Sequence, residues 1–510
     1  MDLISLVATF LITFVFGLLL YFKRAFAYWK RKRVPYIEPR FPFGTIENPA
    51  TRKDYIGIRI KKQYDQLKSK GHKHGGLYFF ARPCYLPIDT EYIKNIMSKD
   101  FQYFVDRGTY YNEKDDPLSA HLFNIEGQKW RNLRAKLTPT FTSGKMKTMF
   151  HTIVAYSDRL IEAMAEFTDK REPVDIKDIL GRFTTDIIGS CAFGLDCNSF
   201  KDPDSEFKKY GQMIFSSATL RQALRNIIAF ANPKLGMFLG ITINNSKATK
   251  FFMNVVEETV KYRETTNFTR KDFMQILIDL KNNVKVGDEE ENGKHNNKGF
   301  TIEEIAAQAF VFFLAGYETS STTMAFCLYE LAMNPEIQDR LREEINQTFE
   351  NQSETITYEG VMEMKYLSQV VDETLRKYPP GSLIPRICVE DYQIPNTDII
   401  IDKGTRVLIP ALALHHDPEY YPDPDVFDPE RFNDENKKSI HPFTYIPFGE
   451  GPRICIGLRF GLMQAKVGLA FLLKHFKFSV NKKTNVPLIM DPFTLILSTK
   501  DGIWLDVEKI

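Results

Sequence analysis

The chain contains 510 residues, of which 43% are hydrophobic and 26% charged, and its formal net charge is only +2. These values are typical of folded globular proteins, and the near-neutral charge argues against nucleic acid or another polyanion as a partner. The six cysteines are scattered without a Cys-x-x-Cys pair, which argues against a zinc site and against a disulfide framework.

The N-terminal segment is the least polar part of the chain. Residues from Leu3 to Phe22 carry no charge, and they are numerous enough to cross a bilayer as a helix. Basic residues follow from Lys23 to Arg33. Because a positive flank stays on the cytoplasmic side, we expect residues 1–22 to be a retained transmembrane signal-anchor. A cleaved signal peptide would carry its positive charge first.

Residues 23–44 form a basic and proline-rich segment. Pro35, Pro39 and Pro42 stiffen this part of the chain and disfavour a helix. We expect an extended hinge between the anchor and the body, and one folded domain over residues 45–510.

The body alternates between two kinds of pattern. Residues 75–89 and, near the C-terminus, 391–410 and 476–508 predict short strands. Residues 128–380 show mostly helical periodicity, interrupted by a polar stretch at 282–299 that predicts a surface loop. The fold class predicted is mainly α with small β-sheets.

A long helix is predicted from Thr301 to Asn334. Thr301 and Glu304 form a capping box at its start, and Pro335 follows its end. Its centre reads Ala-Gly-Tyr-Glu-Thr-Ser over residues 315–320. Small residues there leave one face thin, and a threonine can bond the carbonyl one turn back and bend the helix.

Two shorter patterns are weak by themselves. Trp130 and Arg134 are four residues apart, and Glu373 and Arg376 are three apart, so each pair shares one helix face. Either pair could lie on an ordinary amphipathic surface.

The most specific pattern surrounds Cys455, in Phe-Gly-Glu-Gly-Pro-Arg-Ile-Cys-Ile-Gly over residues 448–457. Glycines let backbone N–H groups turn toward the sulfur, and a predicted helix over 458–473 favours a thiolate near its N-terminus. Arg453 offers a cation for a cofactor carboxylate. The pattern indicates a thiolate metal ligand; the alternative is a buried cysteine in a tight turn.

The cysteine segment resembles the haem-binding loop of the cytochromes P-450, with every fixed position present. The Ala-Gly-Tyr-Glu-Thr-Ser segment is similar to their oxygen-activation motif, and the Glu-x-x-Arg and Pro-Glu-Arg-Phe (429–432) segments follow in the family's order. Four local segments, at 141–145, 184–189, 270–274 and 362–367, resemble insect microsomal members of the detoxification type, insect family 6. That group is similar to the vertebrate drug-metabolising branch.

The resemblance implies a role for each motif. Cys455 would be the axial ligand of the iron of haem b, which favours O–O cleavage. Thr319 would act in oxygen activation, and Glu318 would relay protons from solvent. Glu373, Arg376 and Arg431 would form a buried structural triad. The remaining residues implied to contact the cofactor are Trp130, Arg134, Arg107, Arg386, Phe448, Arg453, Ala315 and Gly316.

The resemblance implies a monooxygenase of the endoplasmic reticulum membrane that oxidises lipophilic substrates such as insecticides or plant toxins. Electrons would come from NADPH through NADPH–cytochrome P-450 reductase, with cytochrome b5 as a second donor. Basic residues at Lys129, Lys136, Lys145 and Lys147 would dock the reductase, or would be ordinary solvated surface. Four alternatives stay open: an endogenous steroid or fatty-acid hydroxylase, a non-oxygenase haem-thiolate isomerase, a ligand sink, and a membrane-tethered scaffold.

Overall fold

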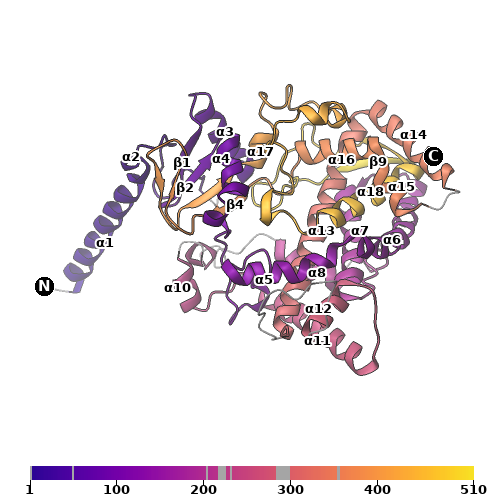
Figure 1. Ribbon diagram of the computed structural model, residues 1–510, viewed down its shortest axis with the longest axis horizontal. Helices are drawn as coiled ribbons and strands as arrows, with labels where there is room; N and C mark the ends of the chain where they lie inside the picture. Colours follow the sequence, from indigo (N-terminus) through magenta and orange to yellow (C-terminus); the bar gives the residue numbers. More distant parts are fainter. Residues whose placement is uncertain are drawn as a thin grey trace. The chain divides into compact units, whose positions relative to one another are not determined.

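The computed structural model describes residues 3–48, 51–202, 205–215, 225–229, 232–282, 299–352 and 356–510 (Figure 1). It is mainly helical, and the described residues form three small sheets, so the predicted fold class is confirmed. The chain divides into two compact units. Unit 1 comprises Met1–Gly108, Ser382–Tyr420 and His441–Arg453, and unit 2 comprises Thr109–Gly381, Tyr421–Ile440 and Ile454–Ile510.

Unit 1 begins with the apolar helix α1 (Leu3–Phe26), drawn in indigo in Figure 1. Among the described residues, it is the one helix that is long and apolar enough to cross a membrane. It extends past the predicted end at Phe22 because Lys23 and Arg24 are good helix formers and suit the negative end of the helix dipole. The short helix α2 (Tyr28–Arg31) follows.

A four-stranded sheet organises unit 1, in the order β1-β2-β7-β4. The short strands predicted over 75–89 are β1 and β2, which pair as an antiparallel hairpin. Strand β2 runs parallel to β7, and β4 runs antiparallel to β7. The other elements of unit 1 are helices and one small strand pair. The bounds are β1 (His74–Phe79), β2 (Arg82–Pro87), β4 (Ile384–Ile387), β7 (Arg406–Ile409), β5 (Tyr392–Gln393), β6 (Ile400–Ile401), α3 (Ile56–Lys68), α4 (Thr90–Lys94) and α17 (Ala411–His415).

The proline-rich segment lies along the edge of this sheet. The Gly76 amide donates to the Pro35 carbonyl at 2.8 Å, and the Ile37 amide donates to the Gly76 carbonyl at 3.0 Å. Trp29 is fully buried, and a Cβ on Gly76 would lie 2.3 Å from its ring. The glycine therefore lets the indole pack directly on β1, which joins the segment after α1 to the sheet.

The buried imidazole of His74 on β1 predicts a pH dependence of stability. Burial lowers the pKa of His74 to about 4, and His72 acts in the same direction. The unfolded chain, with a pKa near 6.5, therefore binds a proton first as the pH falls. The contribution of neutral His74 to the free energy of unfolding is therefore complete above about pH 6.5 and is lost progressively as the pH falls toward 4.

We expect the free energy of unfolding to fall by about 2 kcal/mol between about pH 7 and pH 5 from this residue alone. Urea unfolding of wild type and His74→Phe, which keeps an aromatic ring against Tyr85 and Tyr92, measures the difference. Equal pH slopes for the two proteins would contradict the assignment.

Unit 2 is built from helices and a three-stranded sheet in the order β3-β9-β8. The polar stretch predicted as a loop falls largely on 283–298, outside the described residues. The bounds of the described α-helices of this unit are α5 (Gly127–Leu137), α6 (Ser143–Lys170), α7 (Ile176–Ile188), α8 (Glu206–Phe215), α10 (Pro233–Phe238), α11 (Ser246–Thr266), α12 (Phe273–Lys281), α13 (Ile302–Met333), α14 (Pro335–Asn351), α15 (Tyr358–Glu363), α16 (Lys365–Lys377) and α18 (Leu458–His475). The strands are β3 (Val174–Asp175), β8 (Phe476–Val480) and β9 (Trp504–Lys509).

The long helix α13 is the centre of unit 2 and packs on α7, α11, α16 and α18 (Figure 1). It begins at the predicted capping box, where the Glu304 amide donates to Thr301 Oγ1 and the Thr301 amide donates to Glu304 Oε2. Its residues from Ile305 to Phe310 are buried. The predicted helix from Thr301 to Asn334 is thus confirmed.

Candidate functional site

Cys455 lies just before α18 and is exposed, unlike the other five cysteines. Burial raises the pKa of Cys84, Cys191 and Cys327 to about 12, so these three keep their protons near neutral pH. Cys455 instead lies at the N-terminus of an 18-residue helix, whose partial positive charge favours a thiolate. The helix predicted to follow it is confirmed.

Helix α5 brings Trp130 and Arg134 to this part of unit 2. Trp130 is buried and Arg134 is partly buried. Burial lowers the pKa of Arg134, and the charge of the Cys455 sulfur opposes that effect. The two side chains therefore interact electrostatically, and a neighbouring cation is a usual feature of cysteines that act as thiolates.

The first turn of α18 lies against the centre of α13. A Cβ on Gly461 would lie 4.0 Å from Ser320 Oγ, and a Cβ on Gly316 would lie 4.0 Å from the Phe460 ring. Ala315 is exposed in the middle of α13, although most of this helix is buried. The Ala-Gly-Tyr-Glu-Thr-Ser segment thus packs against the first turn of the helix that follows Cys455.

Gly316 has a packing reason of its own. A Cβ at this position would lie 2.3 Å from Ile188 Cδ1 of α7, so the missing side chain lets α7 approach α13. Of the two small residues, Ala315 is exposed and Gly316 is only partly exposed. Ala315 is therefore the better placed of the two for the proposed cofactor contact.

Thr319 and Glu318 point to different partners. Thr319 Oγ1 donates to the Ala315 carbonyl at 2.5 Å, which confirms the back-bonding predicted for this threonine. Glu318 Oε1 lies 3.0 Å from Lys177 Nζ of α7. Lys177 could not be found from sequence, because its contact with Glu318 exists only once α7 packs on α13.

Two arginines of unit 1 meet near Asp106, and the strand that carries a third passes beside them. Arg453 is buried, and its Nε donates to the Val105 carbonyl at 2.8 Å. Arg107 Nη2 donates to the Arg453 carbonyl at 3.3 Å. The amide of Ile387, next to Arg386, donates to the Asp106 carbonyl at 2.9 Å. The structure therefore brings Arg107 and Arg453 into contact, and it places the strand that carries Arg386 beside Asp106.

One of the glycines before Cys455, Gly451, allows a close backbone approach. Gly449 and Gly451 have φ of +74° and +71°, and a Cβ on Gly451 would lie 2.0 Å from the Met97 carbonyl oxygen. Phe448 beside them is partly buried. Gly451 is thus required by its contact with the 95–99 helical turn, a cause that the sequence did not reveal.

Glu373 and Arg376 of α16 are both completely buried. Arg376 donates through Nε and Nη2 to the two Glu373 carboxylate oxygens at 2.7 and 2.8 Å. Arg431 Nε lies 3.5 Å from Glu373 Oε1. Burial raises the pKa of Glu373, and the two arginines oppose that rise. The triad therefore offsets part of the cost of burying the Glu373 carboxyl group.

Comparison with known proteins agrees with these motifs. The family model described as Cytochrome P450 matches residues 53–505. Probable cytochrome P450 6a14 of Drosophila melanogaster is 46% identical over 492 residues, which cover 96% of each chain. Cytochrome P450 6A1 of Musca domestica is 44% identical over 505 residues, 97% of this chain and 96% of its own. The chain belongs to the cytochrome P450 family.

Membership establishes a cytochrome P450 monooxygenase with a haem cofactor. Within unit 1, Arg386 fits such a group best. The residue is 1% exposed, Nη1 donates to the Pro385 carbonyl, and Nε and Nη2 have no partner among the described residues. Burial lowers its pKa to about 10. A buried, partly unpaired guanidinium calls for a carboxylate, which a haem propionate provides.

Proposed function

We propose that this cytochrome P450 oxidises lipophilic small molecules with O₂ and with electrons from NADPH, delivered by NADPH–cytochrome P450 reductase. The exposed Cys455 before α18, with Arg134 nearby, carries the proposal. Haem b bound by this thiolate would supply oxygen activation, because the sulfur donates electron density that favours O–O cleavage. Arg386, Arg107, Arg453, Trp130 and Arg134 would hold its propionates.

Residues of α13 would supply the polar groups and the apolar wall beside the proposed haem. Thr319 offers a hydroxyl one turn after the exposed Ala315, and Glu318 offers a carboxylate that can hold a proton. Phe310 and Phe313 make this part of α13 strongly apolar, which suits a lipophilic substrate. Xenobiotics such as insecticides or plant toxins are the class proposed.

The proposed location is the cytosolic face of the endoplasmic reticulum. The fully exposed apolar surface of α1 supports an anchor, and the basic residues after it support a cytosolic body.

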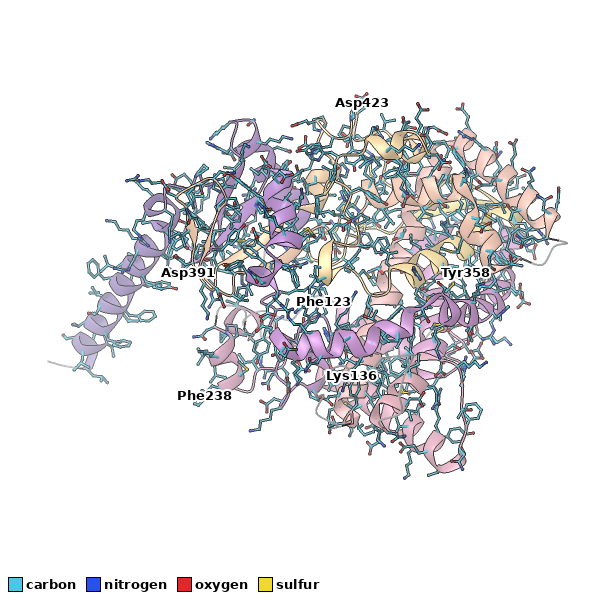
Figure 2. All side chains as sticks on the ribbon, viewed as in Figure 1. Phe123, Lys136, Phe238, Tyr358, Asp391 and Asp423 are labelled. Carbon is cyan, nitrogen blue, oxygen red and sulfur yellow. The ribbon has the colours of Figure 1, made fainter. Side chains whose placement is uncertain are left out.

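The proposed reductase contact uses basic residues of α5 and α6. Lys129 is paired with Glu113 at 2.7 Å, and Lys147 is paired with Glu359. Lys136, labelled in Figure 2, lies over the Phe300 ring at 5.2 Å and is only partly buried. Lys136 and Lys145 are therefore the better candidates for an acidic partner, with cytochrome b5 as a second donor.

The direct test is a reduced carbon-monoxide difference spectrum of the protein in membranes. A strongly red-shifted Soret band is expected from haem with a thiolate ligand. NADPH oxidation that requires both reductase and a lipophilic substrate, with formation of an oxygenated product, then supports the electron source and substrate class. A normal spectrum without O₂-dependent product would favour an isomerase or a ligand sink.

We predict that Thr319→Ala separates NADPH consumption from product formation. Without the hydroxyl, proton delivery becomes disordered, and product per NADPH should fall by about 10-fold or more while peroxide release rises. Thr319→Ser keeps the hydroxyl and should retain most of the coupling. An unchanged product-to-NADPH ratio in Thr319→Ala would remove this role from Thr319.

A further inference from the structure

A cavity of about 360 Å³ lies between α6, the helical turn 189–193 that follows α7, and the loop before α12. This volume is within the usual range of small-molecule sites, roughly 300–1,000 Å³. Ser190 and Arg270 form one side of the cavity. The other side is one face of α6, which carries His151, Thr152, Ala155, Tyr156 and Arg159. None of these residues belongs to the motifs assigned to the haem.

Arg270 is a cation whose charge is not matched by a carboxylate of its own. Its Nη2 donates to the neutral Ser190 hydroxyl at 2.5 Å, which is its one hydrogen bond among the described residues. Its Nε lies 3.6 Å from Asp272 Oδ2, which is too far for a hydrogen bond. Asp272 is instead bonded by the buried Arg263 at 2.6 and 2.8 Å. Because an arginine has five N–H donors, most donors of Arg270 are available to a ligand.

The wall of the cavity is positively charged as a whole. The described residues that line it include two arginines and a histidine but no carboxylate. Arg159 is paired outside the wall, where its Nη1 and Nη2 donate to the two Asp196 carboxylate oxygens at 2.8 and 2.9 Å. Asp186, which is buried nearby, accepts the Ser199 amide at 2.9 Å. Arg270 therefore supplies the excess positive charge.

Neutral groups add further donors and an apolar surface. The imidazole of His151 and the hydroxyl of Thr152 make no hydrogen bond within the part of the chain that the structure describes. Ala155 and the ring of the buried Tyr156 provide apolar wall. Arg159 lies over that ring, with its Cζ 4.8 Å from the ring centroid. The cavity thus combines unused hydrogen-bond donors and a positive charge with a short apolar surface.

We propose that this cavity binds a small organic phosphate ester. At neutral pH a phosphate monoester carries about −1.5 to −2 charges and offers three acceptor oxygens, which match the donors of Arg270, His151 and Thr152. Arginine binds phosphate through charge-assisted, frequently paired hydrogen bonds. The donors come from two separate segments, which suits a tetrahedral group better than a planar carboxylate. The organic part would lie on Ala155 and Tyr156. The inference does not depend on the proposed oxidation chemistry.

Calorimetric titration of the haem-loaded full chain in detergent tests the site with three probes: phenyl phosphate, inorganic phosphate and benzoate. Low ionic strength is required, because salt screens exposed charges. Phenyl phosphate should bind saturably with a Kd below about 1 mM, several-fold tighter than the other two probes, and should leave the Soret band unchanged. Absence of saturable binding, or a shifted Soret band, would overturn the site. Equal binding of benzoate would overturn the preference for phosphate, and equal binding of inorganic phosphate would overturn the role of the apolar wall.

Variants with opposite expected effects separate this site from general surface charge. Arg270→Gln should weaken phenyl phosphate binding by about 10-fold. The matched control is Lys271→Gln, which makes the same change of net charge at the exposed neighbouring residue and should bind like wild type. Asp196→Asn releases the Arg159 guanidinium to the ligand, so affinity should rise several-fold. Equal weakening by Arg270→Gln and Lys271→Gln would overturn the site.

The proposal stays testable if Arg270→Gln fails to fold. Asp196 has a side chain that is 53% exposed, so Asp196→Asn should fold normally. Thr152→Val removes one donor from the partly exposed face of α6 and should weaken binding by about threefold. Wild-type affinity in both Asp196→Asn and Thr152→Val would overturn the assignment of the phosphate to this cavity.

Discussion

Replacing Cys455 with serine should abolish the red-shifted Soret band of the reduced carbon-monoxide complex. The serine hydroxyl has nearly the same size but does not ionise near neutral pH, so the helix dipole of α18 and the nearby Arg134 no longer stabilise an anionic sulfur. Product formation should fall to the background of a haem-free preparation. The spectrum and the haem content per protein measure this effect.

The matched control is another cysteine. Cys197 is partly buried and lies against Gly189, distant in sequence from the Cys455 loop. Cys197→Ala should keep the spectrum and the activity, because its thiol has no charge to contribute: burial raises its pKa. A normal thiolate spectrum in Cys455→Ser would show that another residue binds the iron.

Replacing Arg376 with alanine should destabilise the protein by about 3–5 kcal/mol, because it leaves Glu373 buried without its bidentate partner. A loss of this size is a large fraction of the stability of an ordinary domain. Arg431, at 3.5 Å, cannot replace the two short hydrogen bonds. We expect a lower denaturation midpoint and reduced haem incorporation, measured by urea unfolding and by haem per protein.

The same helix provides the control. Lys365 of α16 pairs with Asp434 at 2.7 Å, but both side chains are largely exposed, and exposed pairs contribute little. Lys365→Ala should therefore retain wild-type haem content and stability. Arg376→Lys keeps the charge but loses the bidentate geometry, so it should fall between Arg376→Ala and wild type. Wild-type stability in Arg376→Ala would contradict the buried triad.

The elements that depend on local patterns were predictable. The capping box at Thr301 and the proline after Asn334 defined α13 at both ends, because caps and proline act within a few residues. The uncharged run after Asp2 defined α1, apart from the extension to Phe26. The helix after Cys455 followed from an apolar, regularly spaced sequence.

Contacts between distant segments were not predictable from local pattern. The packing of Gly316 on Ile188 and the approach of Gly451 to the Met97 carbonyl each join segments more than a hundred residues apart. Resemblance to a family proposed roles for these glycines, but only the packing showed which atoms they accommodate.

The sequence by itself determined the class of chemistry, that of a haem-thiolate monooxygenase. The cysteine loop, the acid–threonine pair and the Glu-x-x-Arg pair are each local patterns of a few residues, so they can be recognised without the fold. Only the tertiary structure decided which groups surround them. Arg386 became a buried cation because β4 pairs with β7, and Lys177 reached Glu318 because α7 packs on α13. Burying a charged side chain costs free energy unless the charge is paired. Which charges are buried, and therefore need a partner, is decided only when the chain has folded.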